Sequence, residues 1–214
     1  MIMKTLKNIL LGILVSIVIT VCNAQTPVKT KQVITLKSVT EHVAPALLAE
    51  SKAVLLRRLE GMKLTHSAIT VVDGKSELII TVSGTITPEA LTELLLTQGN
   101  IRFYSASAAG DTLKEQDIRE AHADLKHAEY PTLCITFKDE AWKRLEELSI
   151  LNMKKPLAFA VDNKVLSSPG VMDTISHGKI SLTGNGFTQT EVRKLAAIIT
   201  AGPLPLKFIV TGTK

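Results

Sequence analysis

The chain has few cysteines and few aromatic residues for a length of 214 residues. One cysteine, Cys22, lies in an N-terminal apolar region, and the other, Cys134, lies in an alternating pattern typical of a strand. Without Cys22 no internal disulfide can form, so we expect Cys134 to be a buried, unreactive thiol. Aromatic residues make up 4% of the chain. Because no basic run contains interleaved aromatic side chains, the sequence does not predict nucleic-acid binding.

Motifs of nucleotide-binding and hydrolytic enzymes are also missing. The G-N-G segment at 184–186 has neither the G-x-G-x-x-G spacing nor the G-K-[ST] ending of a phosphate-binding loop. A glycine-rich turn between a strand and a helix is the interpretation we favour. Ser167 and Ser168 lack the nucleophile elbow of a hydrolase, and the histidine that follows them, His177, is distant in the sequence.

One cluster of histidines and acidic residues resembles a metal site. His122 and His127 lie among the acidic residues Glu120, Asp124 and Glu129. Positions five apart on a helix point roughly 140° away from each other, so the i, i+4 spacing of a zinc-binding helix is absent. We favour a solvated surface, and we predict no enzymatic activity, no metal and no small-molecule cofactor.

Long hydrophobic runs are limited to the N-terminus. Residues 9–21 form a short apolar run after the basic residues Lys4 and Lys7, and small residues at 22–24 precede Gln25. This pattern predicts a secretory signal peptide at 1–24. The alternative is an uncleaved anchor in the inner membrane through residues 9–21. Cleavage leaves 23 basic and 20 acidic residues, a net charge of about +3 that is spread along the chain.

The first half of the remaining chain predicts a compact α+β unit after a polar leader at 25–31. We expect the order strand, helix, strand, strand, helix, strand over residues 32–104, with elements at 33–38, 45–61, 69–72, 78–82, 87–98 and 101–104. This βαββαβ order predicts a ferredoxin-like subdomain.

The second half predicts a similar order after a polar linker at 105–130, which is expected to contain a short helix at 112–123. Residues 131–214 then approximate βαββαβ, with strands at 133–137 and 157–161, a helix capped by Asp139, and a hairpin turn at 162–163. A strand near 180–182 follows, and then a helix that Thr188 caps and Gly202 ends. The last strand, 206–210, can pair back with the first half. The predicted class is α+β with two ferredoxin-like subdomains.

Three short motifs occur in order in the second half. V-D-N-K-V-L-S-S-P at 161–169 is similar to L-D-G-K-V-I-S-A-P, L-T-G-N-G-F-T at 182–188 to I-S-G-N-F-T, and A-G-P-L-P at 201–205 to A-G-A-L-P. Together they resemble the first periplasmic domain of SecD, a membrane subunit of the bacterial Sec protein translocase. The resemblance covers roughly 32–210, although the family's D-L-x-G-G motif is absent around 32–40. We expect structural roles for the motif residues Asp162, Lys164, Pro169, Gly184, Gly202 and Pro205.

The resemblance implies a base and a head subdomain in the periplasm, here without the family's transmembrane bundle. It implies a non-enzymatic role in protein export or folding, in which unfolded secreted polypeptides or Sec membrane subunits are bound transiently. The alternative is an envelope scaffold with one defined protein partner. The sequence does not determine the oligomeric state.

A polypeptide-binding surface is predicted on the head. In the SecD family this region is thought to contact the emerging polypeptide, and apolar residues in or beside its loops are candidates for that contact. They are Val165, Leu166, Val171, Met172 and Phe187. The alternative is that these side chains close the core of the second subdomain.

Overall fold

The computed structural model describes residues 30–105, 112–184 and 186–214. The predicted signal peptide at 1–24 and most of the predicted leader therefore lie outside the described residues. In the described part of the chain, no helix is both long enough and apolar enough to span a bilayer.

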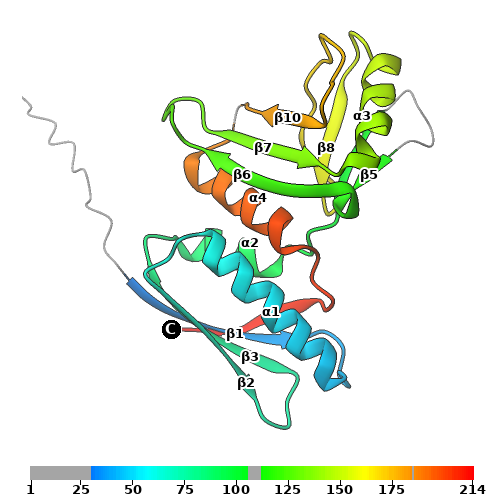
Figure 1. Cartoon of the computed structure of the whole chain (residues 1–214). Coiled ribbons are helices and arrows are strands. Elements are labelled where there is room, and N and C mark those ends of the chain that lie inside the picture. Colours follow the sequence, from blue (N-terminus) through cyan, green and yellow to red (C-terminus); the bar gives the residue numbers. More distant parts are fainter. Residues whose placement is uncertain (1–29, 106–111, 185) are drawn as a thin grey trace, which may run out of the picture.

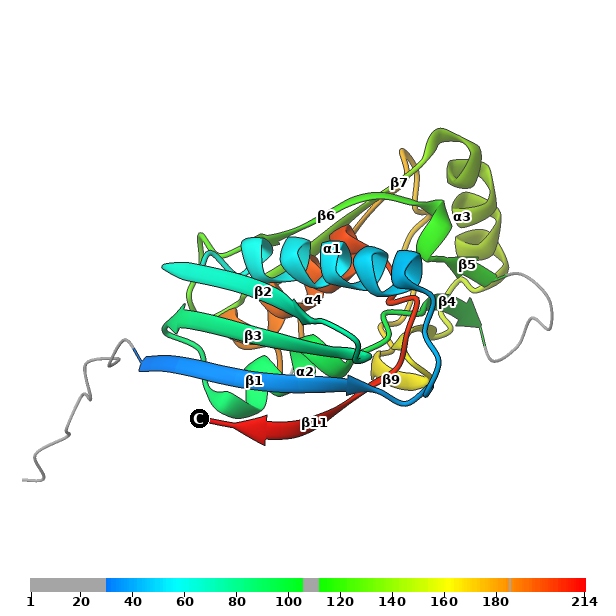
Figure 2. The same ribbon diagram turned by 90° about the horizontal axis from the view of Figure 1, so that it is seen from below.

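The first sheet confirms the expected α+β class and draws its strands from both ends of the chain. Its order is β11-β1-β3-β2, and all neighbours are antiparallel. Figure 2 shows these strands side by side, with α1 and α2 on the face turned toward α4 (Figure 1). We call these elements the base: β1 (Thr30–Ser38), α1 (Pro45–Gly61), β2 (His66–Val72), β3 (Glu77–Gly84), α2 (Pro88–Leu96) and β11 (Phe208–Thr213).

Local sequence explains these elements well. Buried and half-buried residues alternate along β3, as expected for a strand with one face on a core. Helix α2 begins where the Thr87 side chain accepts a hydrogen bond from the backbone N–H of Ala90, with Pro88 in the first turn. The prediction that the last strand returns to the first half is confirmed, because β11 pairs with β1. Residues 101–104, expected to close this sheet, lie instead in β4 of another sheet.

The remaining strands form the head, in two small sheets of order β10-β7-β6 and β5-β4-β8-β9. The second half therefore does not form one four-stranded sheet. The head elements are β4 (Ile101–Ser105), β5 (Thr112–Lys114), the 3₁₀ turn η1 (Glu115–Asp117), β6 (Ile118–Asp124), β7 (Thr132–Phe137), α3 (Asp139–Leu151), β8 (Leu157–Val161), β9 (Lys164–Ser167) and β10 (Lys179–Leu182).

The predicted short helix at 112–123 is wrong, because this segment forms β5, η1 and β6. Glutamate and alanine favour a helix locally. In the fold, however, β6 pairs with β7 along its length, and Ala121 and Ala123 pack against the head core. Tertiary pairing therefore overrides propensity. The prediction that Asp139 caps α3 is also wrong: the helix begins one residue earlier than expected, with Lys138 at the cap position and Asp139 in the first turn.

Helix α4 (Gln189–Ala201) lies between base and head (Figure 1). One set of its side chains, which includes Ile198 and Ala201, joins the base core, and another, which includes Leu195 and Ile199, joins the head core. The predicted ends of this helix are confirmed. The Thr188 side chain accepts a hydrogen bond from the Glu191 N–H at 3.1 Å, and Gly202 adopts φ of 84° after the last turn.

Candidate functional site

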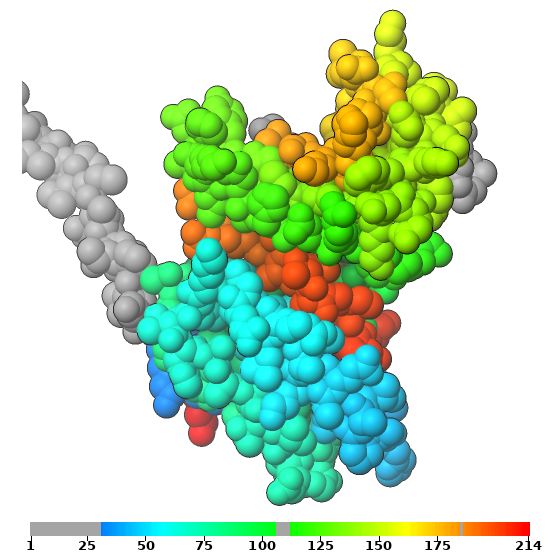
Figure 3. Space-filling view, viewed as in Figure 1, coloured from blue at the N-terminus to red at the C-terminus, as the bar shows by residue number. Residues whose placement is uncertain are grey.

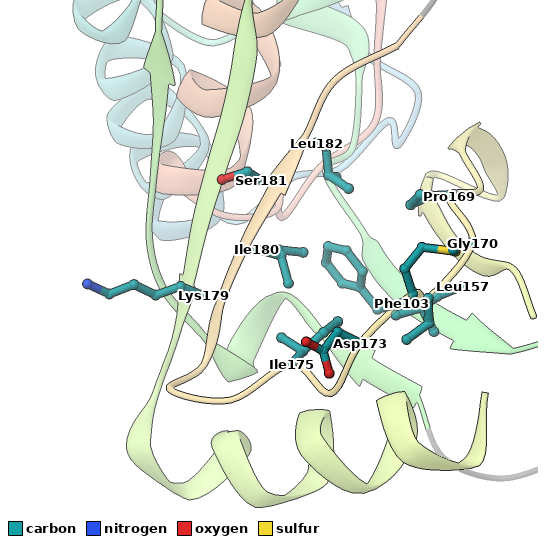
Figure 4. A pocket seen from close by; sticks show the side chains of 12 residues that line it. Phe103, Leu157, Pro169, Gly170, Asp173, Ile175, Lys179, Ile180, Ser181 and Leu182 are labelled. Carbon is teal, nitrogen blue, oxygen red and sulfur yellow. The ribbon is translucent and has the colours of Figure 1, made fainter. Parts of the chain in front are cut away.

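An apolar cavity of about 260 Å³ opens between β10 and residues 169–175 of the head. Figure 4 shows it from close by. Its lining comes from β4, β8, the 169–175 segment and β10, namely Phe103, Leu157, Pro169, Gly170, Val171, Met172, Asp173, Ile175, Lys179, Ile180, Ser181 and Leu182.

Strand β10 forms one wall of the cavity. Side chains alternate along a strand, so Ile180 and Leu182 point toward Phe103, whereas Lys179 and Ser181 point away from it (Figure 4). Among the described strands, β10 pairs with β7 alone and is therefore the edge of its sheet. The cavity lies beside a strand edge with free backbone hydrogen-bonding groups.

The opposite wall is fixed by backbone hydrogen bonds to the end of α3 and the start of β8. The N–H of Leu157 donates to the carbonyl of Pro169 at 2.9 Å, and the N–H of Lys154 donates to that of Val171 at 2.8 Å. The N–H of Ile175 donates to the Ser149 hydroxyl at 2.9 Å. These contacts hold the 169–175 segment in place, so the cavity is preformed.

Aromatic packing fixes the floor of the cavity. Phe103 is 1% exposed, stacks on Phe159 with ring centroids 4.9 Å apart, and meets Phe137 edge-on at 5.3 Å. The rim, in contrast, is open, because Met172 is 83% exposed. A buried apolar floor below an exposed flexible thioether suits the binding of one or two apolar side chains.

The structure separates the five residues predicted to bind polypeptide. Val171 and Met172 both line the cavity, whereas Phe187 is buried in the head core. Leu166 lines a different cavity of about 250 Å³, between β9 and helices α2 and α4, and Val165 lies exposed on β9. Direct contact with a partner is thus open to Met172, Val165 and part of Leu166. Val171 and Phe187 are 6% and 9% exposed and both belong to the head core, which favours the alternative that they close it.

Sequence reasoning missed most of the residues that line the cavity, including the apolar side chains of Phe103, Ile175 and Ile180. Ile180 was visible as part of an alternating strand, but its pattern equally fits a side chain facing a closed core. That β10 is an edge strand depends on the sheet order, which the local sequence does not contain.

The motif residue Asp162 lies where the base meets the head. Asp162 and Asn163 adopt φ of 49° and 69°, which confirms the predicted hairpin turn between β8 and β9. The Asp162 carboxylate accepts hydrogen bonds from the backbone N–H groups of Gln98, Gly99 and Asn100 at 2.6, 3.0 and 2.9 Å. This carboxylate fastens the head hairpin to the segment that links α2 to β4.

A buried arginine lies on the other side of the same segment. The Arg58 guanidinium donates to the carbonyls of Leu94, Thr97, Gln98 and Gly202. Burial lowers the pKa of Arg58 to about 10, and the nearby Asp162 carboxylate partly offsets this shift. Gly99 adopts φ of 90°, and a Cβ there would lie 2.8 Å from the guanidinium, so backbone conformation and space both favour glycine at this position.

The other motif residues lie at turns and element ends. Lys164 begins β9, and the Gly184 carbonyl accepts a hydrogen bond from the N–H of Phe187 at 3.2 Å. Pro169 lines the head cavity, while Gly202 ends α4 and Pro205 is exposed before β11.

The histidines considered as a metal site lie on a strand and a turn instead of a helix. His122 lies on β6, and His127 lies in the β6–β7 connection. The described part of the chain contains no group of three or more His, Cys, Asp or Glu side chains that could hold a metal ion.

A family model described as the SecDF P1 head subdomain matches residues 97–206, just over half of the chain. Among curated proteins, the protein translocase subunit SecD of Acidaminococcus fermentans is 26% identical over 162 residues, which cover 75% of this chain and 38% of the relative. The chain spans about two fifths of the length of this relative and of the SecD of Sebaldella termitidis.

Solved structures agree on the fold. SecDF in a super-membrane-facing form superposes with a TM-score of 0.65 at 18% identity, over 87% of this chain and 30% of that one. A second structure, of a SecDF membrane component described as enhancing protein export, has a TM-score of 0.60 at 18% identity and covers 84% of this chain and 98% of its own. The chain therefore belongs to the SecDF P1 head subdomain family, and its described residues have the fold of a SecD periplasmic P1 domain.

Proposed function

We propose that this domain contributes to protein translocation on the periplasmic side of the membrane by holding extended, unfolded polypeptide weakly in the head cavity. The observation that carries the proposal is the position of a preformed apolar cavity beside the unpaired edge of β10. An extended chain can place an apolar side chain against Phe103 while its backbone pairs with β10. No cofactor or catalytic group is needed for this role.

The size of the cavity supports weak and tolerant binding. Its volume of about 260 Å³ accommodates one or two side chains and not a folded surface. Burying one or two apolar side chains contributes about 1.5–3 kcal/mol each, and a millimolar Kd corresponds to about 4 kcal/mol, so binding is expected on the order of millimolar. Hydrogen bonds between backbones do not depend on the side chains of the bound polypeptide. A domain that binds many exported chains requires such weak specificity.

Family membership supports the same role. The relatives are named protein translocase subunits, and one similar structure is described as a component that enhances protein export. We propose that this chain acts in the same process, with exported polypeptides and Sec membrane subunits as its partners.

The proposal can be tested by photo-crosslinking in cells, with the probe at Met172 and separately at Val165. Both side chains are exposed, but only Met172 lines the cavity. We expect adducts with many secreted proteins at Met172 and few at Val165. Equal yields at both positions would contradict the assignment of the cavity, and one recurrent envelope protein would favour the scaffold alternative.

A purified-protein measurement complements the crosslinking. We expect Met172→Glu to raise the Kd for an unfolded apolar polypeptide about fivefold, because a carboxylate on the rim disfavours apolar side chains. Val165→Glu serves as the matched control and should change the Kd less than twofold. Chemical-shift mapping by NMR measures both values and also reports whether the fold is retained.

A further inference from the structure

A second concave surface, away from the head cavity, follows α4 along the junction of base and head. This groove has a volume of about 680 Å³, and Figure 3 shows α4, in orange, between the cyan of α1 and the green of β6. Its lining comes from the end of α1, from β6 and the residues after it, and from α4: Arg57, Gly61, Lys63, Ala121, His122, Ala123, Asp124, Leu125, Lys126, Arg193, Ala196, Ala197 and Thr200.

Small residues make the floor of this groove. On α4, Ala196, Ala197 and Thr200 follow Arg193 at spacings of three, four and seven, so they share one helical face. On α1, Gly61 lies so close to α4 that an added Cβ would be 2.7 Å from the Ala197 Cβ. The helices therefore approach closely, and the longer side chains of the lining come from other positions.

Those longer side chains are mainly cationic. Arg57, Lys63, Lys126 and Arg193 line the groove, and Asp124 is the one carboxylate among its described lining residues. Asp124 and Lys126 are 3.9 Å apart and exposed, a contact that contributes little in water.

Three of the four cations, Arg57, Lys63 and Arg193, have no charged partner among the described residues. Arg57 uses one nitrogen to donate to the carbonyl of Ala201 at 3.2 Å. Lys63 and Arg193 form no ion pair with any residue that the structure describes. The groove thus combines a concave shape with positive charge that the surrounding protein does not neutralise.

We propose that this groove binds an acidic segment of another polypeptide chain. Carboxylates at alternate positions of an extended segment lie about 6.7 Å apart on one side, a spacing that lets several of them meet cations on opposite walls of the groove. The chemistry also argues against other polyanions. The lining contains no Phe, Tyr or Trp to stack a nucleic-acid base, and a flat membrane surface cannot enter a groove recessed between base and head.

The proposal goes beyond the proposed function, since it uses different residues and a different ligand chemistry. It is tested with a labelled peptide of about ten residues in which Glu alternates with Ser, and with the same peptide carrying Gln in place of Glu. Fluorescence anisotropy with the purified protein should give at least tenfold tighter binding of the Glu peptide at low salt. Added salt should weaken that binding, because exposed charges are screened.

Matched variants locate the binding. The double variant Lys63→Gln/Arg193→Gln should raise the Kd of the Glu peptide about tenfold. The control Lys143→Gln/Lys155→Gln removes the same charge from exposed positions on the head and should change the Kd less than twofold. Circular dichroism checks that both variants fold.

Three outcomes would overturn the proposal. The Glu and Gln peptides could bind equally, or the groove and control variants could weaken binding equally, which would indicate non-specific attraction. Anionic vesicles could also bind more tightly than the Glu peptide, with the same loss in the groove variant, which would assign the groove to lipid headgroups. None of these outcomes bears on Met172, so the head cavity is tested independently.

Discussion

Arg58 donates hydrogen bonds to backbone carbonyls that belong to separate parts of the chain. Leu94 and Thr97 lie at the end of α2, Gln98 begins the link to the head, and Gly202 follows α4. The carbonyls at the end of a helix have no partner within the helix, so the guanidinium acts as a cap for two helices at once. A single cation thereby fixes where α2 and α4 end relative to α1.

We expect Arg58→Met to lower the free energy of unfolding by about 3 kcal/mol, because it leaves buried carbonyls without donors. Urea denaturation measures the change. Arg57→Met is the matched control, because Arg57 is exposed and donates a single side-chain hydrogen bond, to the carbonyl of Ala201. This substitution should lower the free energy of unfolding by less than about 1 kcal/mol. Equal losses in the two variants would contradict the role of Arg58 at the junction.

The pH dependence separates burial of the charge from simple loss of packing. Below about pH 10 Arg58 is protonated in both folded and unfolded chains, so it adds no pH dependence. Above that pH the folded chain binds fewer protons than the unfolded chain, and the unfolding free energy due to Arg58 rises. The advantage of the wild type over Arg58→Met should therefore increase by about 1 kcal/mol between pH 9 and pH 11. A constant difference across this range would show that the guanidinium is not desolvated.

On the scale of the elements, helix α4 makes a contact with α1 that depends on one small residue. Gly61 lies at the end of α1, and a Cβ there would overlap the Ala197 side chain. The last turn of α1 and the middle of α4 are therefore nearly in backbone contact.

Gly61→Ala should lower the free energy of unfolding by about 1–3 kcal/mol, even though alanine favours a helix, because α1 must move away from α4. Thermal denaturation of Gly61→Ala, Ala197→Gly and the double variant measures the coupling. The double variant should recover much of the loss, since the second change restores space for the Cβ. Strict additivity would contradict the close contact. Gly184→Ala, where no atom lies within 4 Å of an added Cβ, is the control.

The helices and strands were predicted correctly where the local sequence pattern and the tertiary packing favour the same structure. Thr188 and Gly202 bound α4 as expected, and the turn at Asp162 has the predicted backbone conformation. It failed at β6, where residues of high helix propensity form a strand because β7 offers them a partner. The cavity was predicted only through Val171 and Met172. Phe103 reaches it from a strand that is remote in sequence, and the edge position of β10, which carries Ile180, depends on the sheet order.

On the scale of the whole molecule, the base is interrupted by the head. The chain leaves the base after α2, builds the head, and returns through α4 to add β11 beside β1. Helix α4 contributes to both hydrophobic cores. Because neither core is complete without it, we expect base and head to unfold together.

Phe208→Ala tests this coupling from the base. Phe208 is 6% exposed on β11, so its truncation should lower the free energy of unfolding by about 3 kcal/mol. The single tryptophan, Trp142, lies on α3 of the head and reports that subdomain by fluorescence. Its unfolding midpoint should shift as far as the midpoint measured by far-UV circular dichroism.

Separate midpoints for the two probes would contradict cooperative unfolding through α4. Ile209→Ala is the control. The Ile209 side chain, next to Phe208 on β11, is 50% exposed, so its truncation should lower the free energy of unfolding by less than about 1 kcal/mol.

The sequence by itself determined the α+β class, the ends of α4, the hairpin at 162–163 and the resemblance to SecD, because each depends on residues close together in the chain. Only the tertiary structure decided that β11 completes the base, that β6 is a strand and that β10 is an edge beside a cavity. It also brought Arg57, Lys63, Lys126 and Arg193 into one groove, although the sequence shows their charge as scattered. The reason is the same in each case: strand pairing and helix packing join segments whose separation in the chain leaves no local pattern.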